Sequence, residues 1–386
     1  MSGRTPLVAL APFNAYLLAL LGAAACGSRR AAPLAGSPGK LRFAVVIPAH
    51  DEEVSLGQTL GSLADVDYPR GLVETVVIAD RCSDRTAEVA TRSGATVWDH
   101  RGEGGKGAAL GWGLARLVSE RPRVEAAVVI DADCSVAPNL LLAMEARLRS
   151  GASAVQAVYE VSNPRASSAA ALRYASFALI NRVRPLGKAA LGLSAGLLGT
   201  GMAFSRELLV AQPWTARSLV EDQEYHLHLV AAGVRVAFAS ETWVRSPMPT
   251  SLRRSESQQL RWDAGRAALA RRWSPQLLAA GVRLRDPARV HAALEPLVPP
   301  QSLLFAANAT GALLALRGSH ATRYAGLANL GGQAGFVAGG LALARAPRAA
   351  WRALAFAPVL AAWKLVLLGR LWLGGGPSDW VRTTRE

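Results

Sequence analysis

The sequence predicts an α/β domain with a largely parallel sheet, joined to apolar helices on both sides. Two observations predict the domain. Short runs rich in Val, Ile and Ala alternate with helical stretches between residues 40 and 240, and several of these runs end in acidic residues. A third observation predicts the apolar helices, because 51% of the 386 residues are hydrophobic, more than an ordinary soluble α/β domain requires.

The alternation defines the elements of the domain in order. β-Branched runs predict strands at residues 42–48, 74–79, 95–98, 126–130 and 154–160. Composition and length predict helices between them, at residues 56–63, 84–93, 107–119 and 138–150. A succession of strand, helix and strand places the strands parallel to one another, with the helices covering the sheet.

Three nearly uncharged runs are long enough to cross a bilayer, at residues 5–27, 297–316 and 324–344. Each contains polar or helix-disturbing residues that must find partners in hydrocarbon. These are Asn14, Pro299, Pro300, Gln301, Asn308, Asn329 and Gln333. A further run at 354–373 contains Lys364 and Arg370, so we expect it to lie at the membrane interface.

Two alternatives remain for these runs. The first resembles a cleaved export signal that ends at a lipidated Cys26, and the other two have the composition of buried core helices. An uncleaved anchor is favoured for the first run, because export would separate the domain from a cytosolic activated substrate.

The net charge of +15 is carried largely by arginines beside the apolar runs, for example Arg29, Arg30, Arg345, Arg348 and Arg352. Positively charged loops usually stay in the cytoplasm, so we expect a multi-pass cell-membrane protein whose domain faces the cytoplasm. The charge does not indicate nucleic acid as a partner, because zinc-finger spacing, a homeodomain-like helix and an aromatic-basic RNA motif are all missing from the sequence.

Acidic side chains follow several strands of the predicted sheet. Glu52 follows the first strand, Asp80 the second, and Asp131 and Asp133 the fourth. Because carboxyl ends of parallel strands meet at one edge, where α/β proteins bind ligands, we expect these carboxylates to lie together. Carboxylates at such an edge can hold Mg²⁺ or Mn²⁺ against a diphosphate. Asp84, which precedes a predicted helix, is expected to be a helix cap instead.

Two further motifs precede or begin helices. Glu221 and Asp222 are either acids at a helix start or groups that take part in chemistry, and one position can serve both roles. Gln258, Arg261 and Trp262 share one face of a helix. This helix is either part of the site or an amphipathic helix at the membrane surface.

The glycine-rich segment 102–107 matches the pattern of dinucleotide-binding loops, but it follows the third strand rather than the first. It is not a P-loop either, because His100 and Gly107 stand where that pattern needs Gly and Ser or Thr. We expect a flexible glycine loop beside the ligand, with Lys106 and backbone amides available for phosphate.

The order and spacing of seven motifs resemble those of the family 2 glycosyltransferases, particularly the membrane-attached members related to cellulose, chitin, hyaluronan and poly-N-acetylglucosamine synthases. The motifs are Val-Val-Ile-Pro-Ala-His-Asp-Glu-Glu at 45–53, Val-Ile-Ala-Asp at 77–80, Gly-Lys-Gly at 105–107, Asp-Ala-Asp at 131–133, Gly-Thr-Gly at 199–201, Glu-Asp at 221–222 and Gln-Gln-Leu-Arg-Trp at 258–262. The sequence departs from the family at His50-Asp51, where aromatic-Asn is frequent, and at Arg81-Cys82. These departures leave the base and sugar preferences open.

The resemblance implies a GT-A fold, a Rossmann-like domain that binds a nucleotide-diphosphate sugar, and inverting transfer with Asp222 as general base. It implies Mg²⁺ or Mn²⁺ as cofactor, ligated by Asp133, and a UDP-hexose or UDP-N-acetylhexosamine as preferred donor. The implied donor-binding residues are Pro48, Ala49, Glu52, Asp80, Lys106, Asp131, Asp133 and Arg261. The implied acceptor-binding residues are Gly199, Thr200, Gly201, Glu221, Gln258 and Trp262.

The resulting domain plan has six parts. They are a membrane anchor (1–27), a linker (28–39), the GT-A domain (40–250), interfacial helices with the Gln-x-x-Arg-Trp motif (251–295), two transmembrane helices (296–345) and an interfacial helix with a cytosolic tail (346–386). The acceptor is a glycan or a lipid-linked molecule. Two alternatives stay open, a polyprenyl-phosphate glycosyltransferase and a non-catalytic membrane scaffold that binds nucleotide sugars. The sugar, the acceptor, the processivity and the oligomeric state are not determined by the sequence.

Overall fold

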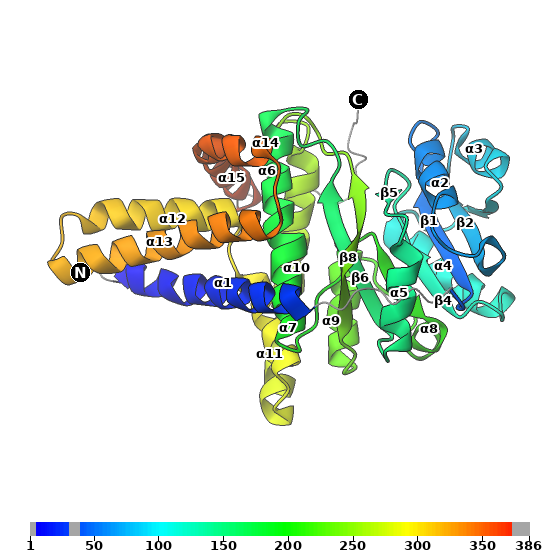
Figure 1. The fold of residues 1–386 in the computed structure, drawn as a ribbon, viewed down its shortest axis with the longest axis horizontal. Coiled ribbons are helices and arrows are strands. Elements are labelled where there is room, and N and C mark those ends of the chain that lie inside the picture. The colour runs from blue at the N-terminus through cyan, green and yellow to red at the C-terminus, as the bar shows by residue number, and fades with distance from the viewer. Residues whose placement is uncertain (1–4, 31–38, 373–386) are drawn as a thin grey trace.

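The computed structural model describes residues 5–30 and 39–372, which form a mixed α/β domain with a bundle of helices projecting from one side (Figure 1). The strands are β1 (Phe43–Ala49), β2 (Val73–Asp80), β3 (Thr96–His100), β4 (Ala126–Val129), β5 (Ser135–Val136), β6 (Ala154–Val161), β7 (Met202–Ser205) and β8 (Val236–Ser246). They form one sheet in the order β3-β2-β1-β4-β7-β6-β8-β5.

Fifteen α-helices are assigned within the described residues. They are α1 (Thr5–Arg30), α2 (Leu56–Ala64), α3 (Thr86–Arg92), α4 (Lys106–Glu120), α5 (Leu140–Arg149), α6 (Ser168–Phe177), α7 (Arg184–Ala190), α8 (Arg206–Ala211), α9 (Glu221–Ala231), α10 (Glu256–Leu284), α11 (Pro287–Leu294), α12 (Gln301–Ala315), α13 (His320–Leu343), α14 (Arg348–Ala353) and α15 (Ala357–Trp372). Short 3-10 turns lie at Arg70–Leu72, Glu295–Leu297 and Leu354–Phe356, and a π-helical turn joins α6 to α7 at Ala178–Val183.

The five predicted strands and four predicted helices are confirmed, with ends that differ by two residues at most. The sheet is less parallel than predicted, because β7 runs antiparallel to both β4 and β6, and β5 antiparallel to β8. The amide of Gly201 donates to the carbonyl of Val129, so the chain enters β7 beside the carboxyl end of β4. A strand that begins at that edge must run opposite to β4. β7 and β8 were not predicted from the sequence.

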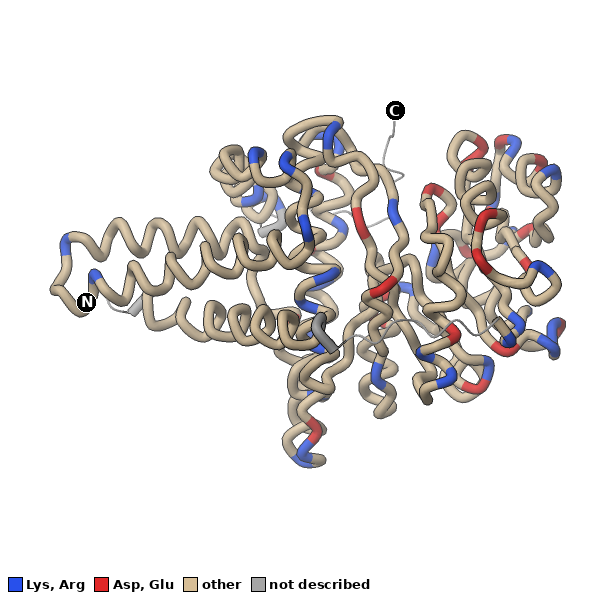
Figure 2. The backbone as a smooth tube through the Cα atoms, viewed as in Figure 1, with Lys and Arg blue, Asp and Glu red and all other residues tan. Residues whose placement is uncertain are grey.

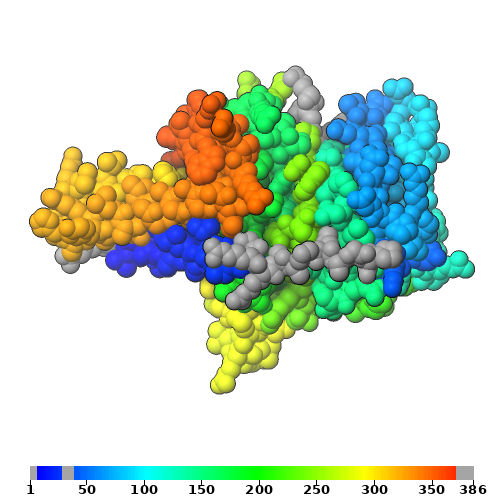
Figure 3. Space-filling model, in the orientation of Figure 1, coloured from blue at the N-terminus to red at the C-terminus, as the bar shows by residue number. Residues whose placement is uncertain are grey.

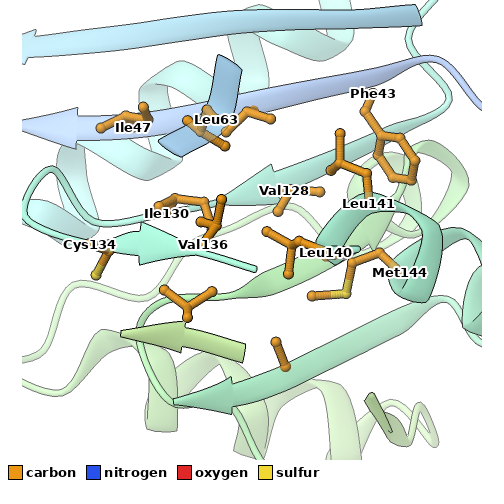
Figure 4. Packing of buried hydrophobic residues seen from close by; sticks show 14 of the residues in the cluster. Phe43, Ile47, Leu63, Val128, Ile130, Cys134, Val136, Leu140, Leu141 and Met144 are labelled. Atoms are coloured by element: carbon orange, nitrogen blue, oxygen red, sulfur yellow. The ribbon is translucent and has the colours of Figure 1, made fainter. Parts of the chain in front are cut away.

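Apolar side chains cover both faces of the sheet. Successive residues of a strand point to opposite faces, so Val45 and Ile47 enter one buried cluster, whereas Ala44 and Val46 enter the other. The first cluster packs β1 and β4 against α2 and α5 (Figure 4). Burial on both faces explains why these strands read as continuous apolar runs.

Helices α1, α12 and α13 lie side by side and project from the domain (Figures 1 and 3). Charged residues on this bundle are confined to its ends (Figure 2). Its interior polar residues partner one another, as the sequence requires. The Asn14 amide donates to Asn308 at 2.8 Å and to Asn329 at 3.0 Å, joining the three helices.

Two segments are long and apolar enough to cross a membrane by length and composition, Leu7–Gly27 and Arg348–Arg370. The first coincides with the predicted anchor. The second was expected at the interface, and it consists of α14, a 3-10 turn and α15 rather than one straight helix. Of the other two predicted spans, α12 is a shorter apolar helix of 15 residues, and α13 does not meet the same test.

Candidate active site

A cavity of about 370 Å³ lies at the carboxyl edge of β1, β2 and β4 and extends between α6, α10 and α15. Every predicted donor-binding residue lines it: Pro48, Ala49, Glu52, Asp80, Lys106, Asp131, Asp133 and Arg261. Asp222, Gly199, Glu221, Gln258 and Trp262 line it too. Thr200 and Gly201 are not among the lining residues. They lie behind the cavity, with Thr200 completely buried.

Lys106, the first residue of α4, connects the acidic groups of the cavity. Its ammonium lies 2.6 Å from Asp131 Oδ1 and 3.7 Å from Glu221 Oε1, and it donates to the Gly199 carbonyl at 2.8 Å. Although burial lowers it, these carboxylates raise the pKa of Lys106 above its usual value. Lys106 therefore places a permanent positive charge between β4 and the start of α9.

The glycine segment before Lys106 forms a defined turn rather than a structureless loop. Gly105 has a φ of +106°, which L-residues rarely adopt, and its amide donates to Asp80 Oδ2 at 3.1 Å. Gly107 lies so close to the chain before α9 that an added Cβ would be 2.6 Å from the Ala216 carbonyl oxygen. These two glycines bring the start of α4 against both β2 and the start of α9.

We expect Gly107→Ala to lower both stability and activity, because the new methyl group forces α4 away from the backbone at Ala216. Overpacking of this kind costs roughly 1–3 kcal/mol. The matched control is Gly61→Ala in α2, where an added Cβ meets nothing within 4 Å. Thermal unfolding of both variants checks this prediction, and equal melting temperatures for the two would contradict it.

Asp80 is held by groups that the sequence analysis missed. Its carboxylate is only 4% exposed and accepts hydrogen bonds from the Gly105 amide and from His100 Nδ1 at 2.9 Å. His100 ends β3 at the position paired with Asp80 in the parallel register. That pairing was the available signal, since both residues end their strands. The buried carboxylate is thus fixed in place at the wall of the cavity.

Glu221 and Asp222 begin α9, as their capping pattern predicts, and also line the cavity. A helix start was expected to lower the pKa of Asp222. The opposite holds, because burial and the neighbouring Glu221 raise the pKa of Asp222 to about 7, outweighing the opposing effect of Lys106. Burial likewise raises the pKa of Glu221. The pair therefore retains a proton close to neutral pH.

Asp131 and Asp133 follow β4 and fit a hard divalent cation. Ligand atoms of Asp131, Asp133 and Cys134 lie within 4.8 Å of one another. Burial raises the pKa of the Cys134 thiol well above its usual value, so the carboxylate oxygens are the suitable donors at neutral pH. Thr200 supports this turn from behind, since its hydroxyl accepts the Asp131 amide at 3.0 Å.

A second acidic group, formed by Asp51, Cys82 and Asp84, is occupied by backbone contacts. Asp84 accepts the Thr86 amide at 2.9 Å, which makes it the cap of α3 that the sequence predicts. Asp51 accepts the Ser83 amide at 2.7 Å. These contacts organise the loops after β1 and β2.

The Gln-x-x-Arg-Trp motif lies in the first two turns of α10 and lines the cavity. Trp262 packs against Phe177 with ring centroids 6.4 Å apart, and the Arg173 guanidinium lies 5.6 Å from the Trp262 ring. Gln258 Oε1 is buried and finds no hydrogen-bond partner within residues 5–30 and 39–372. The motif thus presents an aromatic face and a polar acceptor to the cavity.

Residues 38–265 match the family described as "Glycosyltransferase like family 2". The chain is 25% identical over 241 residues to a "Probable glycosyltransferase" of Sulfolobus acidocaldarius, covering 59% of this chain and 50% of the relative. It is 42% identical over 48 residues to "Probable glycosyltransferase YdaM" of Bacillus subtilis, covering 12% and 11% of the two chains. The chain thus spans half or less of the length of these curated relatives.

Among solved structures, the mannosyltransferase PcManGT from Pyrobaculum calidifontis, in complex with GDP-Man and Mn²⁺, is similar in fold. The TM-score is 0.55 at 19% identity, and the likeness covers 96% of this chain and 99% of that chain. The family match covers more than half of the chain and includes the strand ends, Lys106, Asp222 and Trp262. The chain is therefore a family 2 glycosyltransferase with a GT-A fold.

Proposed function

We propose that the chain is an inverting glycosyltransferase that moves a hexose or N-acetylhexosamine from a nucleotide-diphosphate sugar, preferably a UDP-sugar, to a glycan or lipid-linked acceptor. The observation that carries this proposal is Asp222, a carboxyl of raised pKa that lines the same cavity as Lys106 and Asp131. A base with a pKa near the working pH is suited to removing a hydroxyl proton.

Each group of residues has a distinct task in this proposal. Pro48, Ala49, Glu52 and Asp80 contact the nucleoside and ribose of the donor at the ends of β1 and β2. Asp133, with Asp131, would hold Mg²⁺ or Mn²⁺, which when bound supplies positive charge beside the diphosphate. Lys106 and Arg261 add further positive charge there, and bidentate contact by Arg261 suits a phosphate.

Asp222 takes the proton of the acceptor hydroxyl while that oxygen attacks the anomeric carbon from the side opposite the diphosphate. The carbon–oxygen bond to the diphosphate breaks as the new glycosidic bond forms, so one displacement inverts the configuration. Gly199, Glu221, Gln258 and Trp262 form the acceptor side of the cavity, where the indole offers a plane for a sugar ring. Thr200 and Gly201 contribute by supporting the strand ends.

The proposed setting is the cell membrane, with the GT-A domain (40–250) in the cytoplasm. The uncharged shafts of α1, α12 and α13 support insertion of this bundle, and the arginines at its domain-side end support the orientation. Residues 251–295 and α15 then lie along the interface. Four crossings, with α15 as a further span, are the alternative that the length of Arg348–Arg370 favours.

Nucleoside-diphosphate release from a panel of nucleotide sugars tests the proposal. In membranes that contain the full chain, one donor is expected to turn over with Mg²⁺ or Mn²⁺ and lose at least about tenfold in rate with a chelator. Asp133→Asn should reproduce the chelator effect even with metal present. Cys26→Ser is the control, because Cys26 is exposed and outside the cavity. Binding of a donor without any turnover, in the presence of cellular lipid and glycan extracts, would favour the scaffold instead.

A further inference from the structure

Three cationic side chains from three different helices line the part of the cavity that lies away from the sheet. They are Arg173 of α6, Arg266 of α10 and Lys364 of α15, and we refer to them as the cation cluster. None of them belongs to a family motif identified in the sequence. Only the tertiary structure brings them together, because Arg173 and Lys364 are almost two hundred residues apart.

The cation cluster has a single carboxylate beneath it. Asp263, with a side chain 6% exposed, lies 2.7 Å from the Lys364 ammonium and 3.9 Å from an Arg266 nitrogen. Arg173 instead donates to the neutral amide oxygen of Gln259 at 2.7 Å. Three positive charges therefore surround one negative charge.

The remaining charged groups of the cavity do not correct this imbalance. Its acidic lining residues, among those the structure describes, all lie at the sheet edge or at the start of α9: Glu52, Asp80, Asp131, Asp133, Glu221 and Asp222. Arg184 also lines the cavity, but it pairs with Glu295 at 3.1 Å. The cation cluster thus carries an excess of positive charge in a largely buried place.

Burial of this excess is unfavourable in the absence of a ligand. Desolvation lowers the pKa of Arg173 to about 10, and it also lowers the pKa of Arg266. Buried charges are retained in proteins when they are paired, so a binding site for an anion explains the arrangement. Arginine in particular favours phosphate, through planar pairs of hydrogen bonds.

The neighbours of the cation cluster are apolar. Leu172, Phe177 and Ile180 line the cavity from α6 and the turn after it, and Leu360 lines it one helical turn before Lys364. The lining continues to Pro299 and Pro300, directly before the apolar helix α12. A ligand that fits both features has an anionic group attached to an apolar chain.

We propose that the cation cluster is an acceptor subsite for a phosphate group that links an apolar chain to a hydroxyl-bearing head group. The phosphate contacts Arg173, Arg266 and Lys364, the chain lies against α12 and α15, and the hydroxyl points toward Asp222. In the transfer, the acceptor O–H bond breaks, its proton goes to Asp222, the oxygen bonds to the anomeric carbon, and the nucleoside diphosphate leaves. This inference rests on the proposed function and specifies the acceptor class.

Equilibrium binding of a short polyisoprenyl monophosphate to the purified full chain in micelles tests the subsite without any need for turnover. Arg173→Gln and Lys364→Met should each weaken binding roughly tenfold or more, because each removes a charge-assisted contact. The matched control is Arg370→Gln, which removes a cation from the same helix as Lys364. Arg370 is 56% exposed, pairs with Glu256 and does not line the cavity, so binding should be unchanged.

Three comparisons make the result decisive. The corresponding polyisoprenol and inorganic phosphate should each bind at least about tenfold more weakly than the lipid phosphate, which separates the anionic lipid from its two parts. Arg173→Lys should retain part of the binding, and thermal unfolding of each variant identifies any that does not fold. Equal binding of alcohol and phosphate overturns the subsite. So does a loss of nucleotide-sugar affinity in Arg173→Gln with lipid binding intact, because the cations would then serve the donor.

The proposed function and this subsite fail in different ways. If no nucleotide sugar turns over but the lipid phosphate binds through the cation cluster, the transferase assignment of this chain fails and the subsite stands. If a donor turns over onto an uncharged glycan and the cation-cluster variants transfer at the wild-type rate, the subsite fails and the transferase stands.

Discussion

Asp222→Asn is expected to slow sugar transfer by about 10²–10⁴-fold, the usual contribution of a positioned general base. The amide keeps the size of the side chain but cannot accept the hydroxyl proton. Donor affinity should remain within about twofold of the wild type, because Asp222 lies at the start of α9 and not at the donor edge of β1 and β2. Initial rates with a single nucleotide sugar, together with its equilibrium binding, check both parts.

The matched control is Glu224→Gln, in the same first turn of α9. Glu224 accepts hydrogen bonds from the amides of Arg217 and Ser218 and does not line the cavity. Transfer should therefore fall far less than in Asp222→Asn. Comparable losses in the two variants would mean that the helix start, rather than a base, is what transfer requires.

The same substitution should stabilise the metal-free protein at alkaline pH. Since the pKa of Asp222 rises from 3.8 to about 7 on folding, the folded chain binds more protons in that interval, and its stability falls as the pH rises through it. Asp222→Asn removes this loss, which amounts to at most about 4 kcal/mol. Its melting temperature should match the wild type near pH 4 and exceed it at pH 8.

Lys106→Met is expected to lower kcat/KM by about 10²–10³-fold, the effect of removing one charge from a water-poor site that stabilises developing negative charge. It leaves Asp131, Glu221 and Asp222 without the cation that lies between them. The pKa of Asp222 should rise further, so the ascending limb of the pH–rate profile should move to higher pH. Rates measured from pH 6 to 9 show the shift.

Lys106→Arg is the informative companion variant. It keeps a positive charge but cannot reproduce the short contacts to Asp131 and the Gly199 carbonyl, so its pH profile should stay close to the wild type while its rate falls. An unshifted profile in Lys106→Met, with only the donor KM raised, would show that Lys106 serves the donor phosphates and does not tune Asp222.

Much of the site was predictable because it depends on short stretches of chain. The runs that became β1, β2 and β4 each end in polar or acidic residues, and parallel strands bring such ends to one edge. Glu221 and Asp222 could be assigned to a helix start from capping chemistry alone. The asparagines of α1, α12 and α13 were expected to need partners, although which ones they choose depends on packing.

Other features depend on contacts between distant segments. The direction of β7 follows from where the chain re-enters the sheet beside Val129, and His100 reaches Asp80 through the register of β2 and β3. The raised pKa of Asp222 reverses the expectation from its helix position, because burial depends on everything packed around it. The cation cluster had no sequence signal, since its members come from α6, α10 and α15.

By itself the sequence determined the family, the strand-helix alternation, the carboxylates at the sheet edge and the helix that begins at Glu221, since local propensity, periodicity and motif spacing are properties of short segments. The tertiary structure alone decided which charges face one another: Lys106 between Asp131 and Glu221, and Arg173 and Lys364 at one cavity. Electrostatic energy depends on distance and on exclusion of water, and neither quantity exists until the chain is folded.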